Sequence, residues 1–333
     1  MYIYAVLPQL IMQDKEIMTY KALHYDRQIS VLHAHPDFFG NDKGGGSFKG
    51  KKYPFVLEKG VHNLFEPIRS SACQYFRDNN ISWWGGHAPT GHMLSSQIAC
   101  LNHLFAIRED ADAVLALINN IRPDLHFEKV LPLAIDKDRK YIAFEAVSAI
   151  DHLNEGEPTR GANCTSVDAL IAAETANGDV WLLPIEWKYT ESYPPTDKSG
   201  EARKGEIRLG RYSDLLRNSE YLRKYDSYAH TPYFFEPFYQ LMRQTLWAEQ
   251  MILHKDSEWI KADHFLHLHV IPSGNASLLN KKYRCTGKDM EESWHDHLLS
   301  DSYQIITPEK LLSPLQETGR YSKLMEYLRV RYW

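Results

Sequence analysis

The pattern of apolar and polar positions between residues 159 and 191 predicts a β-hairpin. Two runs rich in apolar residues flank Asn177-Gly178, a pair that is a strong turn signal. The first run carries Asp168, and the second ends in Glu186-Trp187-Lys188. One acid is therefore expected on the first strand, and an acid and a lysine two residues apart on the second.

The length of the hairpin loop decides which of these side chains share a face, because side chains alternate along a strand. A two-residue loop would set Asp168 against Trp187 and point it away from Glu186. A three-residue loop, residues 176–178, sets Asp168 against Glu186, with Lys188 on the same face. We predict this loop, because Gly178 supplies a positive φ and because the reverse face becomes uniformly apolar. Its pairs are Val167–Trp187, Ala169–Ile185, Ile171–Leu183 and Ala173–Trp181.

Apolar spacing elsewhere predicts the elements around this hairpin. Residues 94–107 and 110–121 have helical spacing, and a further helix is expected to begin at Pro237. Residues 140–150 and 264–271 have the composition of strands.

Two polar stretches interrupt this pattern. Residues 39–53 are rich in glycine and lysine and predict a loop. Their similarity to a phosphate-binding loop is superficial, because Lys52 replaces the required Ser or Thr. Residues 192–230 form a polar insertion with several arginines and lysines. It suits either a solvated excursion or a segment that crosses a phosphate backbone.

The hairpin face carries the groups that a metal-dependent phosphodiesterase needs. Mg²⁺ prefers oxygen ligands and keeps several waters, so Asp168 and Glu186 suffice with a substrate phosphate. The backbone carbonyl of Trp187 is a further candidate ligand, and Glu145 is either a third carboxylate or a structural residue. Lys188 is expected to orient or deprotonate the attacking water and to stabilise the charged transition state. The alternative is an ordinary Glu186–Lys188 ion pair on a solvated strand face.

Two segments resemble the PD-(D/E)xK nuclease superfamily, in particular a bacterial group of restriction endonucleases. They are Gly161–Ala169 and Ile185–Glu191, and His92–Gln97 is similar to the helix start that precedes them in that group. The resemblance covers roughly residues 80–275, and Val167 stands where the superfamily usually has proline.

The resemblance implies an α/β fold with an α-β-β-β-α-β core, in which helices flank a mixed central sheet. It also implies dependence on Mg²⁺, for which Mn²⁺ can substitute, and cleavage of DNA. We expect a loop-rich N-terminal extension (residues 1–90), the nuclease core (91–275) with the insertion 192–230, and a C-terminal helical extension (276–333).

Polar side chains around the predicted site are candidates for contacts with nucleic acid, although each also suits an ordinary polar surface. They are Gln97, Arg203, Lys204, Arg208, Arg211, Gln240, Arg243 and Gln244. His267 and His269 share one strand face, and we expect hydrogen-bonded histidines there rather than metal ligands.

Composition excludes several classes of protein. The chain has 333 residues, of which 44% are hydrophobic and 24% charged, as in an ordinary globular protein. Its net charge of −5 excludes a polycation but not a local basic surface. The four cysteines form no CxxC pair, which argues against a zinc ribbon or a disulfide framework. Without a signal peptide or a bilayer-length apolar run, we expect a cytoplasmic protein with no membrane partner.

We therefore expect a Mg²⁺-dependent DNA endonuclease of restriction or defence type. The alternatives are a catalytically silent DNA-binding module on the same fold, or a nuclease that acts on RNA or on strand ends. A Ser/His hydrolase is disfavoured, because no G-x-S-x-G sequence occurs. Two cuts in a duplex commonly need two active sites, so we expect a homodimer. A partner methyltransferase or defence-system protein stays open.

Overall fold

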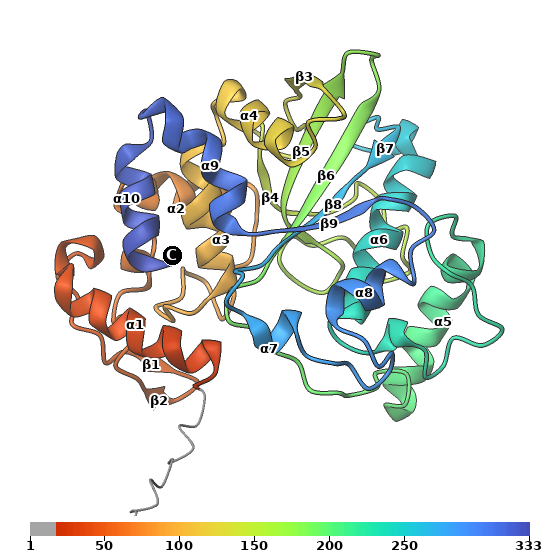
Figure 1. The fold of residues 1–333 in the computed structure, drawn as a ribbon, viewed down its shortest axis with the longest axis horizontal. Coiled ribbons are helices and arrows are strands. Elements are labelled where there is room, and N and C mark those ends of the chain that lie inside the picture. Colours follow the sequence, from red (N-terminus) through yellow and green to blue (C-terminus); the bar gives the residue numbers. More distant parts are fainter. Residues whose placement is uncertain (1–17) are drawn as a thin grey trace, which may run out of the picture.

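A computed structural model describes residues 18–333, and one seven-stranded mixed sheet lies at its centre (Figure 1). The strand order is β3-β5-β6-β8-β9, with β4 also paired to β5 and β7 to β6. β3, β4 and β6 each pair with β5 in antiparallel orientation. β7 and β8 pair with β6, and β9 pairs with β8, all in parallel orientation. The strands are β3 (Phe127–Val130), β4 (Ala143–Ala146), β5 (Val167–Thr175), β6 (Val180–Trp187), β7 (His264–Phe265), β8 (His267–Val270) and β9 (Tyr303–Ile306).

Helices cover both faces of this sheet (Figure 1). One layer contains α1 (Tyr20–Ala34), α2 (Arg69–Asp78), α3 (Ser96–Leu104), α4 (Ala111–Ile121), α9 (Pro308–Thr318) and α10 (Ser322–Arg331). The other contains α5 (Ala202–Asn218), α6 (Phe238–Leu253) and α8 (Met290–His295), and the short α7 (Ala276–Leu279) lies near the edge of the sheet. A small hairpin of β1 (Ser47–Phe48) and β2 (Lys51–Lys52) lies beside α1.

The register of the central hairpin confirms the three-residue loop. Ala169 pairs with Ile185, Ile171 with Leu183 and Ala173 with Trp181, which are pairs that the three-residue loop predicts. The amide of Thr175 donates to the carbonyl of Asp179 at 3.0 Å and closes the turn. Gly178 has the positive φ of 88° that the turn was expected to need.

Each face of the hairpin belongs to a separate apolar cluster, as an alternating strand between two helical layers requires. Ile171, Ile185 and Trp187 pack toward the α3 and α10 side. Leu170 and Leu182 pack toward α6. Val167 was expected to share the face of Trp187, and this expectation is wrong: it packs in the cluster on the α6 side.

Several predicted elements are present with shifted bounds. The helix expected over residues 94–107 is α3 followed by a 3-10 turn, and Asp110 caps the start of α4. The strand expected over 140–150 is only the four-residue β4. Residues 264–271 form two short strands, β7 and β8, and the amide of Leu266 between them donates to the carbonyl of Leu182 on β6.

Several elements were not predicted from the sequence, among them α1, α2 and the following three. Within the polar insertion, residues 202–218 form the helix α5, which buries Tyr212 and Leu216 against the sheet layer. β3 is a four-residue strand at the edge of the sheet. β9 lies within residues 276–333, which were expected to be helical, and pairs with β8 in the central sheet. Such short strands are stabilised by partners distant in sequence, which local patterns do not reveal.

The order of elements along the chain contains α3, β4, β5, β6, α6 and β8, with α4, β3 and α5 inserted. This sequence of types is α-β-β-β-α-β once the insertions are set aside. That it is the core of a restriction endonuclease remains a proposal. Residues 18–90 pack into the same apolar cluster as α3 and α4, and the expectation for residues 1–17 lies outside the described range.

Within residues 18–333, no helix is both long enough and apolar enough to cross a bilayer.

Candidate active site

The hairpin brings two predicted groups into direct contact at the end of β6. Lys188 donates from Nζ to Oε1 of Glu186 at 2.6 Å, and both side chains are buried, at 4% and 3% exposure. Oδ2 of Asp168 accepts a hydrogen bond from the backbone amide of Trp187 at 2.7 Å. Asp168 as a whole residue is partly buried.

Glu145 on β4 adds a third carboxylate to the same neighbourhood. Its neighbours Phe144 and Ala146 pair with β5, but Glu145 has φ = +49° and is absent from the ladder opposite Asp168. A left-handed backbone at a non-glycine residue costs about 1–3 kcal/mol and persists only where the surroundings enforce it. Here Arg160 donates to the carbonyls of Phe144 and Glu145 and holds the distorted segment.

The buried carboxylates raise each other's pKa. Burial is the main cause that raises the pKa of Asp168 well above its usual value, and the charges of Glu186 and Glu145 add to it. Burial also raises the pKa of Glu145 to about 7, with Glu186 contributing. Burial alone would lower the pKa of Lys188, but the acidic groups around it, Glu186 first among them, together outweigh burial and raise the pKa well above normal. Lys188 is therefore a protonated ammonium rather than a base.

Two glutamines on α6 hold the Glu186–Lys188 pair. Gln240 accepts from Nζ of Lys188 at 2.6 Å and donates to Oε1 of Glu186 at 2.7 Å. Gln244 donates to the other oxygen, Oε2, of Glu186. Residues four apart lie on one helix face, so both amides reach the same carboxylate. The sequence suggested nucleic-acid contacts for these glutamines, whereas the structure places them against the site. Their i, i+4 spacing was the available signal.

Gln97 and Arg243 also bond to residues around the site. Gln97 at the start of α3 donates to Oε1 of Glu145 at 2.7 Å. Arg243 donates to Glu155 at 3.0 Å, and Glu155 in turn accepts from the hydroxyl of Thr165 at 2.8 Å. This chain of bonds fixes the segment that enters β5 just before Asp168.

The four basic residues predicted on the insertion lie on α5, and none of them bonds to the site carboxylates among the described residues. Arg203 and Lys204 are exposed, Arg208 pairs with Glu201 at 2.8 Å, and Arg211 is half-buried. Contact between these residues and nucleic acid stays a prediction.

A hollow of about 130 Å³ lies between the segment that enters β5 and helix α6. Its lining includes Ser166, Gln240 and Gln244, and Oε1 of Gln244 is a buried acceptor without a donor among the described residues. The hydroxyl of Ser166 lies 3.4 Å from Oε2 of Glu145, which places the hollow beside the third carboxylate.

The donor set fits a hard divalent cation. With all three carboxylates ionised beside the Lys188 ammonium, the group would carry a net charge of −2, which one Mg²⁺ ion would balance. Without a cation, the raised pKa of Asp168 and of Glu145 favours protonation of these two acids. Within residues 18–333, no three His, Cys, Asp or Glu side chains converge closely enough to form a metal cluster by themselves. Mg²⁺ needs only one or two carboxylates with water and substrate oxygens, so Asp168 and Glu186 suit it. The carbonyl of Trp187 stays a predicted ligand.

The two strand histidines differ from each other. Nδ1 of His269 lies 2.9 Å from the hydroxyl of Tyr303, as expected for a hydrogen-bonded histidine. Both ring nitrogens of His267 lack a partner among the described residues, so that expectation is wrong for His267. Burial and the charge of Lys188 lower the pKa of His267 to about 3, which keeps this ring neutral.

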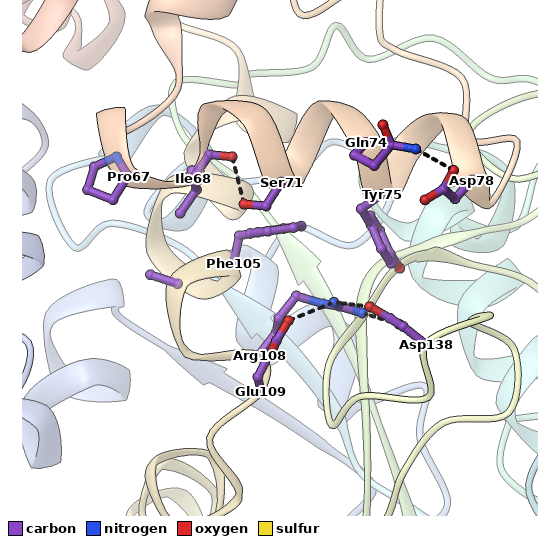
Figure 2. Close-up of a pocket in the computed structure, with 11 residues that line it drawn as sticks. Pro67, Ile68, Ser71, Gln74, Tyr75, Asp78, Phe105, Arg108, Glu109 and Asp138 are labelled. Atoms are coloured by element: carbon purple, nitrogen blue, oxygen red, sulfur yellow. Dashed lines mark hydrogen bonds and ion pairs between the residues drawn. The ribbon is translucent and has the colours of Figure 1, made fainter.

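A second buried charged group lies behind a separate cavity of about 350 Å³ (Figure 2). Arg108 at its base pairs with Asp138 at 2.6 Å and with Asp136 at 3.1 Å. Its guanidinium also stacks 4.4 Å from the ring centre of Tyr75. Since carboxylates already neutralise this arginine, Arg108 offers no free positive charge to a ligand in the cavity.

These observations define a mixed α/β protein in which one hairpin buries an acid-x-lysine pair beside two further carboxylates. Residues 33–333 match a family model described as "Restriction Endonuclease associating with ARP", and the chain belongs to this family. No curated protein and no solved structure matches the chain.

Proposed function

We propose that this protein is a Mg²⁺-dependent nuclease of the PD-(D/E)xK type that hydrolyses phosphodiester bonds in DNA. The observation that carries the proposal is that Glu145, Asp168 and Glu186 lie together with a single ammonium, Lys188, and that burial and mutual repulsion raise the pKa of Asp168 and Glu145. A bound cation would stabilise the ionised carboxylates, and perturbed carboxyl groups of this kind are typical of functional sites. Membership of a restriction endonuclease family supports DNA as the substrate.

In this proposal Asp168 and Glu186 hold the metal, assisted by the carbonyl of Trp187 and by Glu145. When bound, Mg²⁺ supplies the Lewis acidity that polarises a phosphoryl oxygen. Lys188 stays cationic because its pKa is raised. Its Nζ would donate a hydrogen bond to the negative charge that develops on the phosphate. Gln240 and Gln244 orient Glu186 and Lys188 for these roles.

The direct test is incubation of the purified chain with methylated and unmethylated genomic DNA, with Mg²⁺ or with EDTA. We expect cleavage with Mg²⁺, none with EDTA, and none for Asp168→Ala. Asp179→Ala is the matched control, because Asp179 is an exposed carboxylate at the turn of the same hairpin. Its cleavage rate should equal that of the wild type.

The outcomes separate the alternatives. Folded protein that leaves varied DNA intact with Mg²⁺ and with Mn²⁺, yet binds DNA in a salt-sensitive way, would show a silent binding module. Parallel incubations with RNA and with circular DNA distinguish an endonuclease from an enzyme that acts on RNA or on strand ends.

The description of the family names an association with ARP. We therefore include in the proposal that this chain acts together with ARP. A homodimer and a partner methyltransferase are further expectations, to be measured by the mass of the purified assembly and by cleavage of methylated DNA.

A further inference from the structure

An exposed aromatic pair lies in a second, wider hollow near the β1–β2 hairpin. The ring of Trp84 stacks on Phe48, with centroids 5.2 Å apart and planes 25° from parallel. Trp84 is 45% exposed, although large aromatic side chains are usually buried. The hollow has a volume of about 780 Å³ and is lined by residues 47–49, Leu57, Glu58, Gly60 and residues 84–91. We refer to it as the Trp84 groove.

A tight turn presents Trp84 to solvent. The amide of Gly86 donates to the carbonyl of Trp83 at 3.2 Å, and Gly85 has φ = +89°, a value that favours glycine. Trp83 is buried and stacks 3.7 Å from Phe76. One tryptophan therefore anchors the turn, and the next one projects from it. An added Cβ at Gly85 or Gly86 would meet nothing within 4 Å, so this side of the turn is open.

The surroundings of the groove are basic, although the chain carries a net charge of −5. The ammonium of Lys49 lies 5.4 Å from the centre of the Phe48 ring. Burial and then the charges of Lys21 and Lys49 lower the pKa of His92, whose ring lies against Phe48, to about 4. Exposed lysines continue along and beside the hairpin at Lys43, Lys51, Lys52 and Lys59. Glu58 is the acidic residue in the lining of the groove.

The groove is directly connected to the candidate active site. The backbone amide of Trp84 donates to Oε1 of Gln97 at 2.9 Å, and the amide nitrogen of Gln97 donates to Glu145 at 2.7 Å. One glutamine side chain thus spans from the turn that carries Trp84 to a site carboxylate. The turn that carries Trp84 is therefore held in place by a residue that also contacts the candidate site.

We propose that the Trp84 groove binds an unpaired base of the nucleic-acid substrate, which stacks on Trp84 and Phe48 while the hairpin lysines contact neighbouring phosphates. This inference rests on the proposed nuclease function. An indole or phenyl face can stack on any base, but only a base outside the duplex stack exposes its own face. The substrate class is therefore DNA that contains a single-stranded segment, an overhang or a flipped nucleotide next to the cleaved bond.

The test measures binding without cleavage. Wild-type protein in EDTA is titrated into a duplex with a single-stranded overhang that carries 2-aminopurine, and into the same duplex with blunt ends. The Trp84→Ala variant removes the ring but keeps the backbone bond to Gln97. Trp259→Ala is the matched control, because Trp259 is exposed to a similar extent, at 44%. Trp84→Phe tests whether another aromatic ring restores binding.

We expect 2-aminopurine emission to be quenched by the wild type, by Trp259→Ala and in part by Trp84→Phe. Trp84→Ala should lose the quenching and weaken overhang binding on the order of tenfold, from one lost stacking contact, with little change for the blunt duplex. Equal binding of the overhang by Trp84→Ala, or an equal loss for both duplexes, would overturn the inference. The inference would also be overturned if Trp84→Ala no longer bound a protein partner but still bound the overhang as tightly as the wild type.

The proposed function and this inference can fail separately. Cleavage by the wild type combined with normal overhang binding by Trp84→Ala refutes only the stacking platform. Quenching without any cleavage in Mg²⁺ refutes only the nuclease. A wild type that binds neither duplex and cleaves nothing refutes both.

Discussion

Two buried charged groups lie on either side of Arg160, and they differ in charge balance. In the first, Asp136 accepts from Tyr75, from Arg160 at 2.9 Å and from Arg108 at 3.1 Å, while Asp138 pairs with Arg108. Two carboxylates thus face two guanidinium groups. In the second, Glu145, Asp168 and Glu186 face Lys188 as the one cationic side chain bonded to them among the described residues.

This difference separates a structural cluster from a candidate reactive site. Buried charges are tolerated when each has a partner and its hydrogen bonds are satisfied. The group around Asp136 meets this condition and ties α2 to β4 through Tyr75, whose hydroxyl also accepts from the amide of Phe144. In the group around Asp168 three carboxylates share one ammonium, and the pKa of Asp168 and of Glu145 is raised. Arg160 joins the two, because it bonds to Asp136 and to the backbone of Glu145.

The largest effect is expected where the balanced group is broken. Arg160→Met should lower the free energy of unfolding by about 3–5 kcal/mol, because it leaves Asp136 with one guanidinium fewer and releases the Glu145 backbone. Urea denaturation followed by circular dichroism measures this. Arg217→Met is the control, since its pair with Asp214 is exposed and should contribute little. Equal midpoints for the two variants would contradict a structural role.

The next largest effect is expected at the lysine of the unbalanced group. Lys188→Ala should lower the rate of Mg²⁺-dependent cleavage by on the order of 10²–10³-fold, through loss of the donor to developing charge. Lys261→Ala, at an exposed site, should leave the rate unchanged. Single-turnover cleavage at saturating Mg²⁺ is the measurement. A rate within twofold of the wild type would remove Lys188 from the mechanism.

A smaller loss is expected for the glutamines that hold Glu186. Gln244→Ala and Gln240→Ala should each reduce activity or apparent Mg²⁺ affinity by about 10–100-fold, because they orient the carboxylate and lysine rather than react. Gln250→Ala on the same helix is the control, since its side chain is half-buried and, among the described residues, has no hydrogen bond to Glu186 or Lys188. If a higher Mg²⁺ concentration restores the cleavage rate of Gln244→Ala but not that of Lys188→Ala, then Gln244 orients a metal ligand and Lys188 acts on the substrate.

The smallest effect is on the pH dependence of stability. The pKa of Glu145 is raised to about 7 in the folded chain, so the folded protein binds more protons than the unfolded one between the two pKa values. This contribution to stability is complete at low pH and is lost as pH rises through 7. Metal-free wild type should therefore lose on the order of 1–2 kcal/mol between pH 5.5 and 8.

Thermal denaturation at the two pH values, with EDTA and with Mg²⁺, measures this effect. Glu145→Gln should flatten the dependence, whereas Glu128→Gln at an exposed strand position should not. Mg²⁺ should restore stability at pH 8 in the wild type, because the ion replaces the lost protons. The prediction would be contradicted if the metal-free wild type became more stable from pH 5.5 to 8 and Glu145→Gln removed that increase.

The hairpin shows how far sequence reasoning reached. A three-residue loop with Gly178 at positive φ is a local property, and the observed register agrees with it. The expected pairing of Asp168 with Glu186 lies beyond the observed ladder, and the Asp168 carboxylate accepts from the amide of Trp187. The insertion shows the opposite case. Its polar composition suggested a solvated excursion, yet α5 buries one face on the α6 side. Packing against distant residues decided that outcome.

The sequence by itself determined the chemistry of the site, because the acid on β5 and the acid-x-lysine on β6 lie within one local hairpin whose register depends on loop length. Only the tertiary structure decided which other side chains join them. It added Glu145 through a distorted strand, moved Gln240 and Gln244 from expected nucleic-acid contacts to the Glu186–Lys188 pair, and placed Trp84 one glutamine away from the carboxylates. Those contacts join residues dozens of positions apart, and their geometry depends on how the helices pack on the sheet.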